Sequence, residues 1–185
     1  PERTSQLMQL SKYHGLGNDF LITFADGVAH GGAELARRLC HRTHGVGADG
    51  LIFATEVEAG EGLAASATFA LFNSDGSRAE VSGNGLRCFA QAVACHLDRN
   101  ELVLAVKTDA GARRVDVSLD EVDPVAVAAV EMGEMTPLGL GSERTDRLSA
   151  LLADAVGRVE RWGTGSLGNP HIVLQVRDPL SLDLR

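Results

Sequence analysis

"FNSDGSRAEVSGNGLRCFAQAVACHLD", residues 72–98, is the most informative stretch of the sequence. Its second half predicts a helix over 84–98 whose surface is apolar nearly all round. The thin polar stripe on this helix consists of Arg87, Gln91 and Asp98. A helix of that kind is buried in a domain core, so we expect strands to wrap around it.

Short or alternating apolar runs bounded by Gly, Asp and Asn predict strands in much of the remaining sequence. The expected strands cover residues 7–13, 20–24, 51–55, 67–72, 102–107, 113–118, 125–131, 157–162 and 171–176. Two further helices are expected at 32–43 and 142–156. Because strands dominate and do not alternate regularly with helices, the pattern predicts an α+β protein.

A weak internal repeat bears on the domain organisation. The segments "GNDFLITFAD" (17–26) and "GNPHIVLQVRD" (168–178) share a Gly-Asn pair followed by an apolar strand that ends in Asp. They are either two unrelated turn-strand units or the same unit in two copies of one domain. The Gly- and Pro-containing segment at 133–143 is the linker-like stretch between them.

We therefore expect an N-terminal domain over 1–130 and the first part of a second, similar domain over 131–185, which is incomplete within this sequence. If the chain ends at Arg185, the strand at 171–176 has no later strand to pair with. An unpaired apolar edge favours association, so a homodimer is one expected assembly.

The composition favours a cytoplasmic protein with a small-molecule ligand. The 185 residues include 17 Lys and Arg against 25 Asp and Glu, which gives a net charge of −8, and the basic residues are scattered. The basic patch that binds nucleic acid or an anionic membrane is therefore not expected. No apolar run reaches the roughly 18 residues of a membrane span, and the N-terminus lacks a signal-peptide core.

Three cysteines, Cys40, Cys88 and Cys95, with no CxxC pair argue against a disulfide framework and for a reducing compartment. Because Cys88 and Cys95 fall on the apolar helix, we expect both to be core residues.

The start of the helix at 84–98 is a candidate binding site. Gly83 and Asn84 lie at its first turn, where backbone N–H groups without partners and the helix dipole favour an anion. Glycine lets a ligand approach the backbone closely, and an amino-acid α-carboxylate has a suitable size and charge. Ser82 precedes this turn in the N-cap position, where its side chain either caps the helix or takes part in chemistry.

Other polar residues carry weaker signals. Asn18, Asn73 and Asn169 occur in turns, where asparagine is common without any functional role. His171 follows the last of these turns, and a histidine is useful for moving a proton if it faces a site. The segment "GVGADG" at 45–50 matches GxGxxG, but an expected helix precedes it and an expected strand follows it. A dinucleotide site requires the opposite order, so we do not assign one.

Five segments together resemble diaminopimelate epimerase in order and spacing. They are "YHGLGNDFLI" (13–22), "RTHGVGADGLI" (42–52), "FNSDGSRAEVSGNGLRCFA" (72–90), "EMGEMTP" (131–137) and "GSLGNPHIVLQV" (165–176). The resemblance implies two similar domains, each a mixed sheet curled into a barrel around a central helix. It also implies catalysis without metal or pyridoxal phosphate, by two cysteines on opposite faces of the substrate α-carbon. One removes the proton as a thiolate, and the other returns a proton from the far side.

The resemblance also assigns roles to individual residues. It makes three turn asparagines contacts to an amino-acid substrate: Asn18, Asn73 and Asn169. Gly83 and Asn84 would meet the α-carboxylate of that substrate. Ser82 stands at the position of the first catalytic cysteine, and His171 would bias a catalytic proton.

The sequence departs from the family pattern in three places. Ser82 replaces the first catalytic cysteine, and an alkoxide is far less accessible at neutral pH than a thiolate. Gly50 stands where the family commonly has a glutamine that touches the substrate. The family's second cysteine, a glutamate-arginine pair and a further asparagine correspond to sequence beyond Arg185.

The expected function is interconversion of LL- and meso-diaminopimelate by cofactor-independent, two-base proton transfer at the α-carbon, in lysine and peptidoglycan precursor synthesis. The departures from the family pattern put the activity of this chain in question. Two alternatives therefore stay open. One is a non-catalytic homologue that binds an amino acid, and the other is a dehydratase or eliminase on the same fold that needs a single base.

Overall fold

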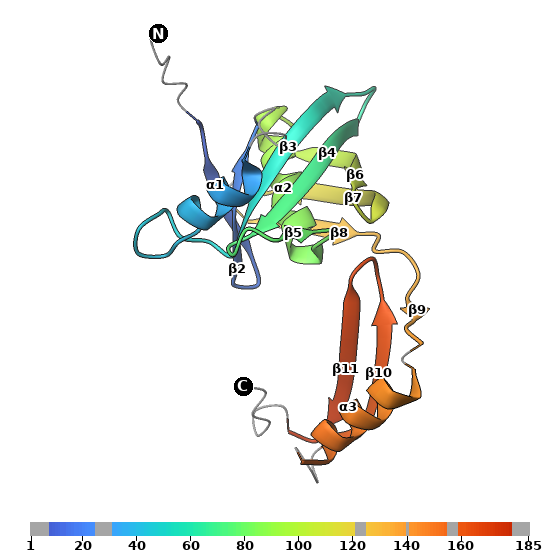
Figure 1. Ribbon diagram of the computed structural model, residues 1–185. Helices are drawn as coiled ribbons and strands as arrows, with labels where there is room; N and C mark the ends of the chain where they lie inside the picture. The colour runs from blue at the N-terminus through green and yellow to red at the C-terminus, as the bar shows by residue number, and fades with distance from the viewer. Residues whose placement is uncertain (1–7, 25–30, 121–124, 140, 155–158, 179–185) are drawn as a thin grey trace. The chain divides into compact units, whose positions relative to one another are not determined.

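The computed structural model describes residues 8–24, 31–120, 125–139, 141–154 and 159–178. The chain forms two compact units, residues 1–132 and 133–185, and each is described here by itself (Figure 1).

The first unit contains one eight-stranded sheet and two helices. Its elements are β1 (Ser11–Gly15), β2 (Asn18–Thr23), α1 (Gly32–Leu39), β3 (Gly50–Ala59), β4 (Ala64–Asn73), β5 (Arg78–Ala79), α2 (Gly83–His96), β6 (Glu101–Thr108), β7 (Gly111–Leu119) and β8 (Ala126–Val130). The strand order is β1-β2-β3-β4-β6-β7-β8, with β5 paired to β4. The β2–β3 and β4–β6 pairs are parallel and the other pairs are antiparallel, so the sheet is mixed.

The sheet curls around α2 into a half-barrel. Helix α2 contacts β1 and β2 from one side of the strand order and β7 and β8 from the other, as Figure 1 shows. Leu86, Phe89 and Val93 of α2 are fully buried, and the Phe89 ring meets the Phe69 ring edge-on at 5.3 Å between centroids. Burying side chains of this size contributes about 1.5–3 kcal/mol each. The predicted α+β fold with strands around this helix is confirmed.

Helix α1 covers part of the opposite face of the sheet. A second apolar cluster forms between it and the strands, and includes Ala36, Phe53 and Phe72. The chain then passes through the glycine-rich segment 45–50 into β3. A side chain on Gly45 would collide with the backbone oxygen of Arg38, so this glycine serves the chain reversal after α1. The helix therefore ends at Leu39 rather than at residue 43 as predicted.

The second unit contains a three-stranded antiparallel sheet and one helix. Its elements are β9 (Thr136–Pro137), α3 (Ser142–Asp154), β10 (Val159–Ser166) and β11 (Pro170–Val176), with strand order β11-β10-β9. Parts of three predicted elements lie outside the described residues, namely residue 7, residues 155–156 and residues 157–158. Among the described helices, none has the length and apolar character that crossing a membrane would require.

Candidate functional site

Several sequence-predicted residues lie at one end of the half-barrel. Gly50 at the start of β3 pairs with Asn73 at the end of β4, and Asn18 begins the parallel strand β2 at the same end. The first turn of α2 reaches this end too, because a Cβ atom placed on Gly15, the partner of Asn18, would lie 3.5 Å from the Cβ of Asn84. We call the following group the polar end: Asn18, Asn73, Ser82, Gly83 and Asn84.

Ser82 is the N-cap of α2, and its backbone is extended at φ −142° and ψ 121°. Its Oγ accepts a hydrogen bond from the Gly85 N–H at 3.0 Å, and its carbonyl oxygen accepts one from the Leu86 N–H at 2.8 Å. The side chain is half-buried. The structure thus confirms the capping geometry, and it places the Ser82 hydroxyl at the start of a buried helix.

Gly83 and Asn84 supply two further N–H groups at this helix start. Among the described residues, neither N–H has an acceptor, and both residues are only half-buried. No acidic side chain occurs in the first turn. The Asn84 Oδ1 accepts a weak hydrogen bond from Arg87 Nη1 at 3.4 Å. Two N–H donors at the positive end of a helix dipole make this turn suitable for an anion.

The Asn18 side chain is held by a carboxylate. Its Nδ2 donates to Asp49 Oδ2 at 2.6 Å, and the same oxygen accepts the Asp19 N–H at 3.0 Å. The other Asp49 oxygen, Oδ1, accepts from Arg42 Nη2 at 2.7 Å. Asp49 therefore has a partner on each of its carboxylate oxygens.

Lys12, Asp19, Arg42 and Asp49 form a charged cluster behind Asn18. Arg42 reaches Asp19 at 2.8 Å and Asp49 at 2.7 Å, while Lys12 Nζ lies 3.0 Å from Asp19 Oδ2. A hydrogen bond from Arg42 is the largest effect that holds the pKa of Asp19 well below its usual value. Burial opposes it with a smaller effect, and a hydrogen bond from Lys12 adds to the lowering. Hydrogen bonds to Asp19 and Asp49 raise the pKa of Arg42. Asp19 and Arg42 therefore stay charged across the physiological pH range.

Asn73 is held by a neighbouring hairpin loop. Its Nδ2 donates to Ser77 Oγ at 2.9 Å, and the Ser77 hydroxyl donates to Asp75 Oδ1 at 2.6 Å. The Ser77 N–H also donates to Asp75 Oδ1 at 2.8 Å. These bonds from Ser77 lower the pKa of Asp75.

The remaining predicted site residues, Asn169 and His171, belong to the second unit. Asn169 lies in the turn between β10 and β11, and its Oδ1 is 2.9 Å from His171 Nε2. With this oxygen as acceptor, Nε2 carries the imidazole proton. The His171 side chain is half-buried at the start of β11. The structure brings these two residues together.

Gly50 has no room for a side chain in this conformation. A Cβ atom there would lie 2.9 Å from both the Phe72 carbonyl oxygen and Leu71 Cδ1. Any larger residue requires a shift of β4.

The two cysteines of α2 differ in their surroundings. Cys88 is buried, as predicted, and burial raises the pKa of its thiol to about 11. Cys95 is exposed, so its expected core position is wrong. Cys95 follows Gln91 by one helical turn and so continues the polar stripe of α2. This stripe faces the side where the half-barrel is open, because the edge strands β1 and β8 do not pair with each other. Burial and the neighbouring Cys95 raise the pKa of Tyr13 to about 12.

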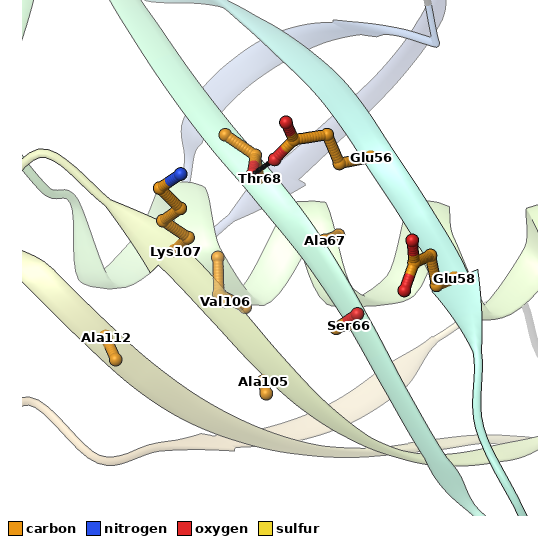
Figure 2. A pocket seen from close by; sticks show the side chains of 9 residues that line it. All are labelled: Glu56, Glu58, Ser66, Ala67, Thr68, Ala105, Val106, Lys107 and Ala112. Carbon is orange, nitrogen blue, oxygen red and sulfur yellow. Dashed lines mark hydrogen bonds between the residues drawn. The ribbon is translucent and has the colours of Figure 1, made fainter.

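Two cavities of the first unit lie away from the polar end. One of about 540 Å³ is lined by Tyr13 of β1, Gln91 and Cys95 of α2, and Ala126 of β8, among others. The other, of about 410 Å³, lies on an exposed face of β3, β4 and β6 (Figure 2). None of the sequence-predicted site residues lines either cavity.

Figure 2 shows the charged side chains of this second cavity. Glu56 has a positive φ of 50° at the β-bulge of β3, and its Oε2 accepts from Thr68 Oγ1 at 2.6 Å. Glu58 and Lys107 lie nearby on the same lining. In the described ranges, no group of three or more metal-ligating side chains comes together.

Sequence reasoning did not single out the residues that hold the two asparagines. Asp49 precedes a buried strand, and Asp75 lies in an Asp-Gly turn, so both read as ordinary loop residues. The clearest signal available was that both aspartates lie inside segments that resemble the family, and that Asp75 is two residues from Asn73.

Comparison with known proteins identifies the family. The family model for diaminopimelate epimerase matches residues 10–137. Diaminopimelate epimerase of Desulfitobacterium hafniense is 38% identical over 95% of this chain and 62% of its own length. Diaminopimelate epimerase of Moorella thermoacetica is 39% identical over 92% of this chain and 61% of its own length. Diaminopimelate epimerase of Methanothermobacter thermautotrophicus is 32% identical over 96% of this chain and 63% of its own length. The chain thus spans a little over three fifths of these relatives.

Solved structures share the fold at low sequence identity. A probable proline racemase from Agrobacterium radiobacter superposes with a TM-score of 0.61 at 16% identity, over 91% of this chain and 52% of its own. A phenazine biosynthesis protein from Bacillus anthracis gives a TM-score of 0.54 at 17% identity, over 92% and 54%. Because the family model matches well over half of the sequence, the chain belongs to the diaminopimelate epimerase family, a family of isomerases.

Proposed function

We propose that the protein binds diaminopimelate at the polar end and belongs to a cofactor-independent machinery that inverts its α-carbon. The observation that carries this proposal is the start of α2, where two N–H groups lack acceptors among the described residues. The resemblance to the family assigns Ser82, the N-cap of the same turn, to the position of the first catalytic cysteine. Membership of an isomerase family supports the reaction class.

The α-carboxylate would accept the N–H groups of Gly83 and Asn84. Such charge-assisted hydrogen bonds are about twice as strong as neutral ones, and the helix dipole adds to them. Asn18 and Asn73 would bind other polar groups of the substrate. The Asn169–His171 contact of 2.9 Å would orient the imidazole that biases a catalytic proton.

Inversion at the α-carbon requires a base on one face and an acid on the other. The base takes the proton and leaves a carbanion, and the acid protonates that carbanion from the opposite face, so no proton is gained or lost overall. Ser82 stands at the position of the base. A serine hydroxyl is a weaker acid than a thiol, so the anion that would remove the proton is far less accessible at neutral pH.

Ser82 therefore favours a second candidate function, that of a homologue that binds the amino acid without inverting it. In this case the helix cap and the carboxylate site are retained, while proton abstraction is lost.

Calorimetric titration with meso-diaminopimelate, together with NMR detection of α-proton exchange in heavy water, tests both candidates. Binding with exchange supports the epimerase machinery, and binding without exchange supports the binding homologue. Absence of binding rejects both. A gain of exchange in Ser82→Cys but not in Ser82→Ala would identify position 82 as that of the base.

A further inference from the structure

Two asparagines of the polar end, Asn18 and Asn73, have their carboxamide orientation fixed from within the protein. Asn18 Nδ2 lies 2.6 Å from Asp49 Oδ2. A carboxylate only accepts hydrogen bonds, so the nitrogen of the amide, and not its oxygen, must face Asp49. The Asn18 carbonyl oxygen therefore points to other partners, and none of the described residues donates to it.

Asp49 is itself held rigidly enough to impose this orientation. Its Oδ1 accepts from Arg42 at 2.7 Å and its Oδ2 accepts the Asp19 N–H at 3.0 Å. The Asp49 N–H in turn donates to Asp19 Oδ1 at 3.2 Å. Rotation of the Asp49 carboxylate would break several charge-assisted bonds, each stronger than an ordinary hydrogen bond.

Asn73 has the same arrangement. The Ser77 hydroxyl gives its proton to Asp75, so its oxygen offers a lone pair to the Asn73 Nδ2 at 2.9 Å. Here Ser77, which Asp75 orients, holds the nitrogen of the asparagine, and the carbonyl oxygen has no donor among the described residues.

We propose that Asp49 is a positioning residue that presents the Asn18 carbonyl oxygen to a protonated amine of the ligand. The proposal rests on the proposed function for the identity of the ligand. An ammonium group carries three donors and no acceptor, so it complements a carbonyl oxygen whose amide nitrogen is already engaged.

The positioning role has a readout that needs no ligand. In ¹⁵N–¹H NMR spectra, the side-chain amide signal of Asn18 is identified by its absence in Asn18→Ser. In Asp49→Asn this signal should move, and its protons should exchange faster with water. The matched control is Asp116→Asn, because Asp116 also pairs with an arginine, at 2.9 Å from Arg114, but holds no asparagine among the described residues. An Asn18 signal unchanged in Asp49→Asn would overturn the positioning role.

The selectivity of the protein between ligands tests whether the Asn18 carbonyl oxygen binds an ammonium group. We compare calorimetric affinities for meso-diaminopimelate and 2-aminopimelate, which lacks one amine. The preference for the diamine should fall by about tenfold in both Asp49→Asn and Asn18→Ser, the equivalent of about 1.4 kcal/mol. A general loss of structure would lower the affinity for both ligands by the same factor. If both variants lose affinity for the two ligands by the same factor, the proposal is overturned. If the wild-type chain binds neither ligand, the proposed function fails and ammonium recognition fails with it, whereas the amide signal still decides the positioning role.

Discussion

The side-chain oxygen of Ser82 caps α2, and the proposed catalytic base would be the atom at this same position. Its Oγ accepts the Gly85 N–H at 3.0 Å, and a thiolate there would accept the same N–H and benefit from the helix dipole. Serine keeps the cap and loses most of the basicity. Substitutions of Ser82 should therefore change proton transfer without removing the proposed carboxylate site, so they test the two functions separately.

Ser82→Cys, in a Cys95→Ser background, should create a thiol that alkylates faster than Cys88. The helix start would stabilise a thiolate by about 0.3–1 kcal/mol when exposed and up to about 2 kcal/mol when partly buried, which lowers the pKa by roughly one unit. Burial instead raises the pKa of Cys88 to about 11. Alkylation rates against pH, with mass spectrometry to locate the label, measure the difference.

The Cys95→Ser background is required because Cys95 is exposed and would compete for the reagent. Meso-diaminopimelate should protect the introduced thiol. If that thiol reacts no faster than Cys88, Ser82 marks only a helix cap.

Asp19 should govern part of the acid stability of the first unit. Arg42 and Lys12 lower its pKa in the folded state, so Asp19 stabilises the fold fully above the unfolded pKa of about 4. This contribution is lost as the pH falls from that value toward the lower folded pKa. The urea midpoint should therefore fall more steeply between pH 5 and pH 3 in the wild type than in Asp19→Asn. Parallel curves would show that Asp19 contributes nothing to the pH dependence.

At the scale of elements, the hairpin loop between β4 and β5 depends on one glycine. Gly76 has a φ of 83°, and a side chain there would lie 2.7 Å from the Ala33 carbonyl oxygen and collide with Arg37. Gly76→Ala should lower the free energy of unfolding by at least about 1 kcal/mol, because it adds a collision to an unfavourable backbone conformation.

Gly62→Ala is the control, because Gly62 also has a positive φ, 59°, but open space around it. Urea unfolding of both variants separates the collision from the backbone cost. Equal losses of stability in the two variants would mean that the hairpin loop yields without strain.

Helix α2 shows how much the sequence alone could predict. The apolar run predicted the position of the helix to within two residues at either end. The helix spans Gly83–His96, and the prediction was 84–98. The same periodicity placed Cys95 in the core, because a sequence does not show where a curled sheet leaves a helix uncovered. That gap depends on which strands form the edges, β1 and β8, and strand order is a property of long-range pairing.

For the candidate site, the sequence indicated individual residues but not the contacts that hold them. The turn residues Asn18, Asn73 and Asn84 were identified through their segments. Asp49 was missed because its role depends on a contact with Asn18, 31 residues away in the chain. Such contacts arise from the parallel pairing of β2 and β3, which local patterns do not specify.

At the scale of the whole molecule, we infer that the two compact units are the two domains expected from the sequence. The two Gly-Asn pairs occupy similar positions in the units. Gly17 lies in the turn of the β1–β2 hairpin, directly before Asn18 at the start of β2, and Gly168 and Asn169 lie in the turn of the β10–β11 hairpin. The two glycines have φ values of 87° and 105°. This likeness favours the duplicated unit over two unrelated turns.

The central claim is that the first turn of α2 binds the substrate carboxylate, and replacing a single N–H group tests it most directly. Gly83→Pro removes the N–H of position 83, at a helix position where proline is well tolerated. Ser82 already has the extended backbone that a following proline requires, at φ −142° and ψ 121°. Gly83→Ala is the matched control, since its Cβ has an ordinary contact of 3.7 Å with Met132 Sδ.

Calorimetry with meso-diaminopimelate on the wild type and these two variants, with circular dichroism to confirm the fold, gives the decisive comparison. We expect Gly83→Ala to bind within about twofold of the wild type and Gly83→Pro to bind at least about tenfold more weakly, because a charge-assisted hydrogen bond is lost. Equal affinity of the proline and alanine variants would contradict a carboxylate site at the start of α2.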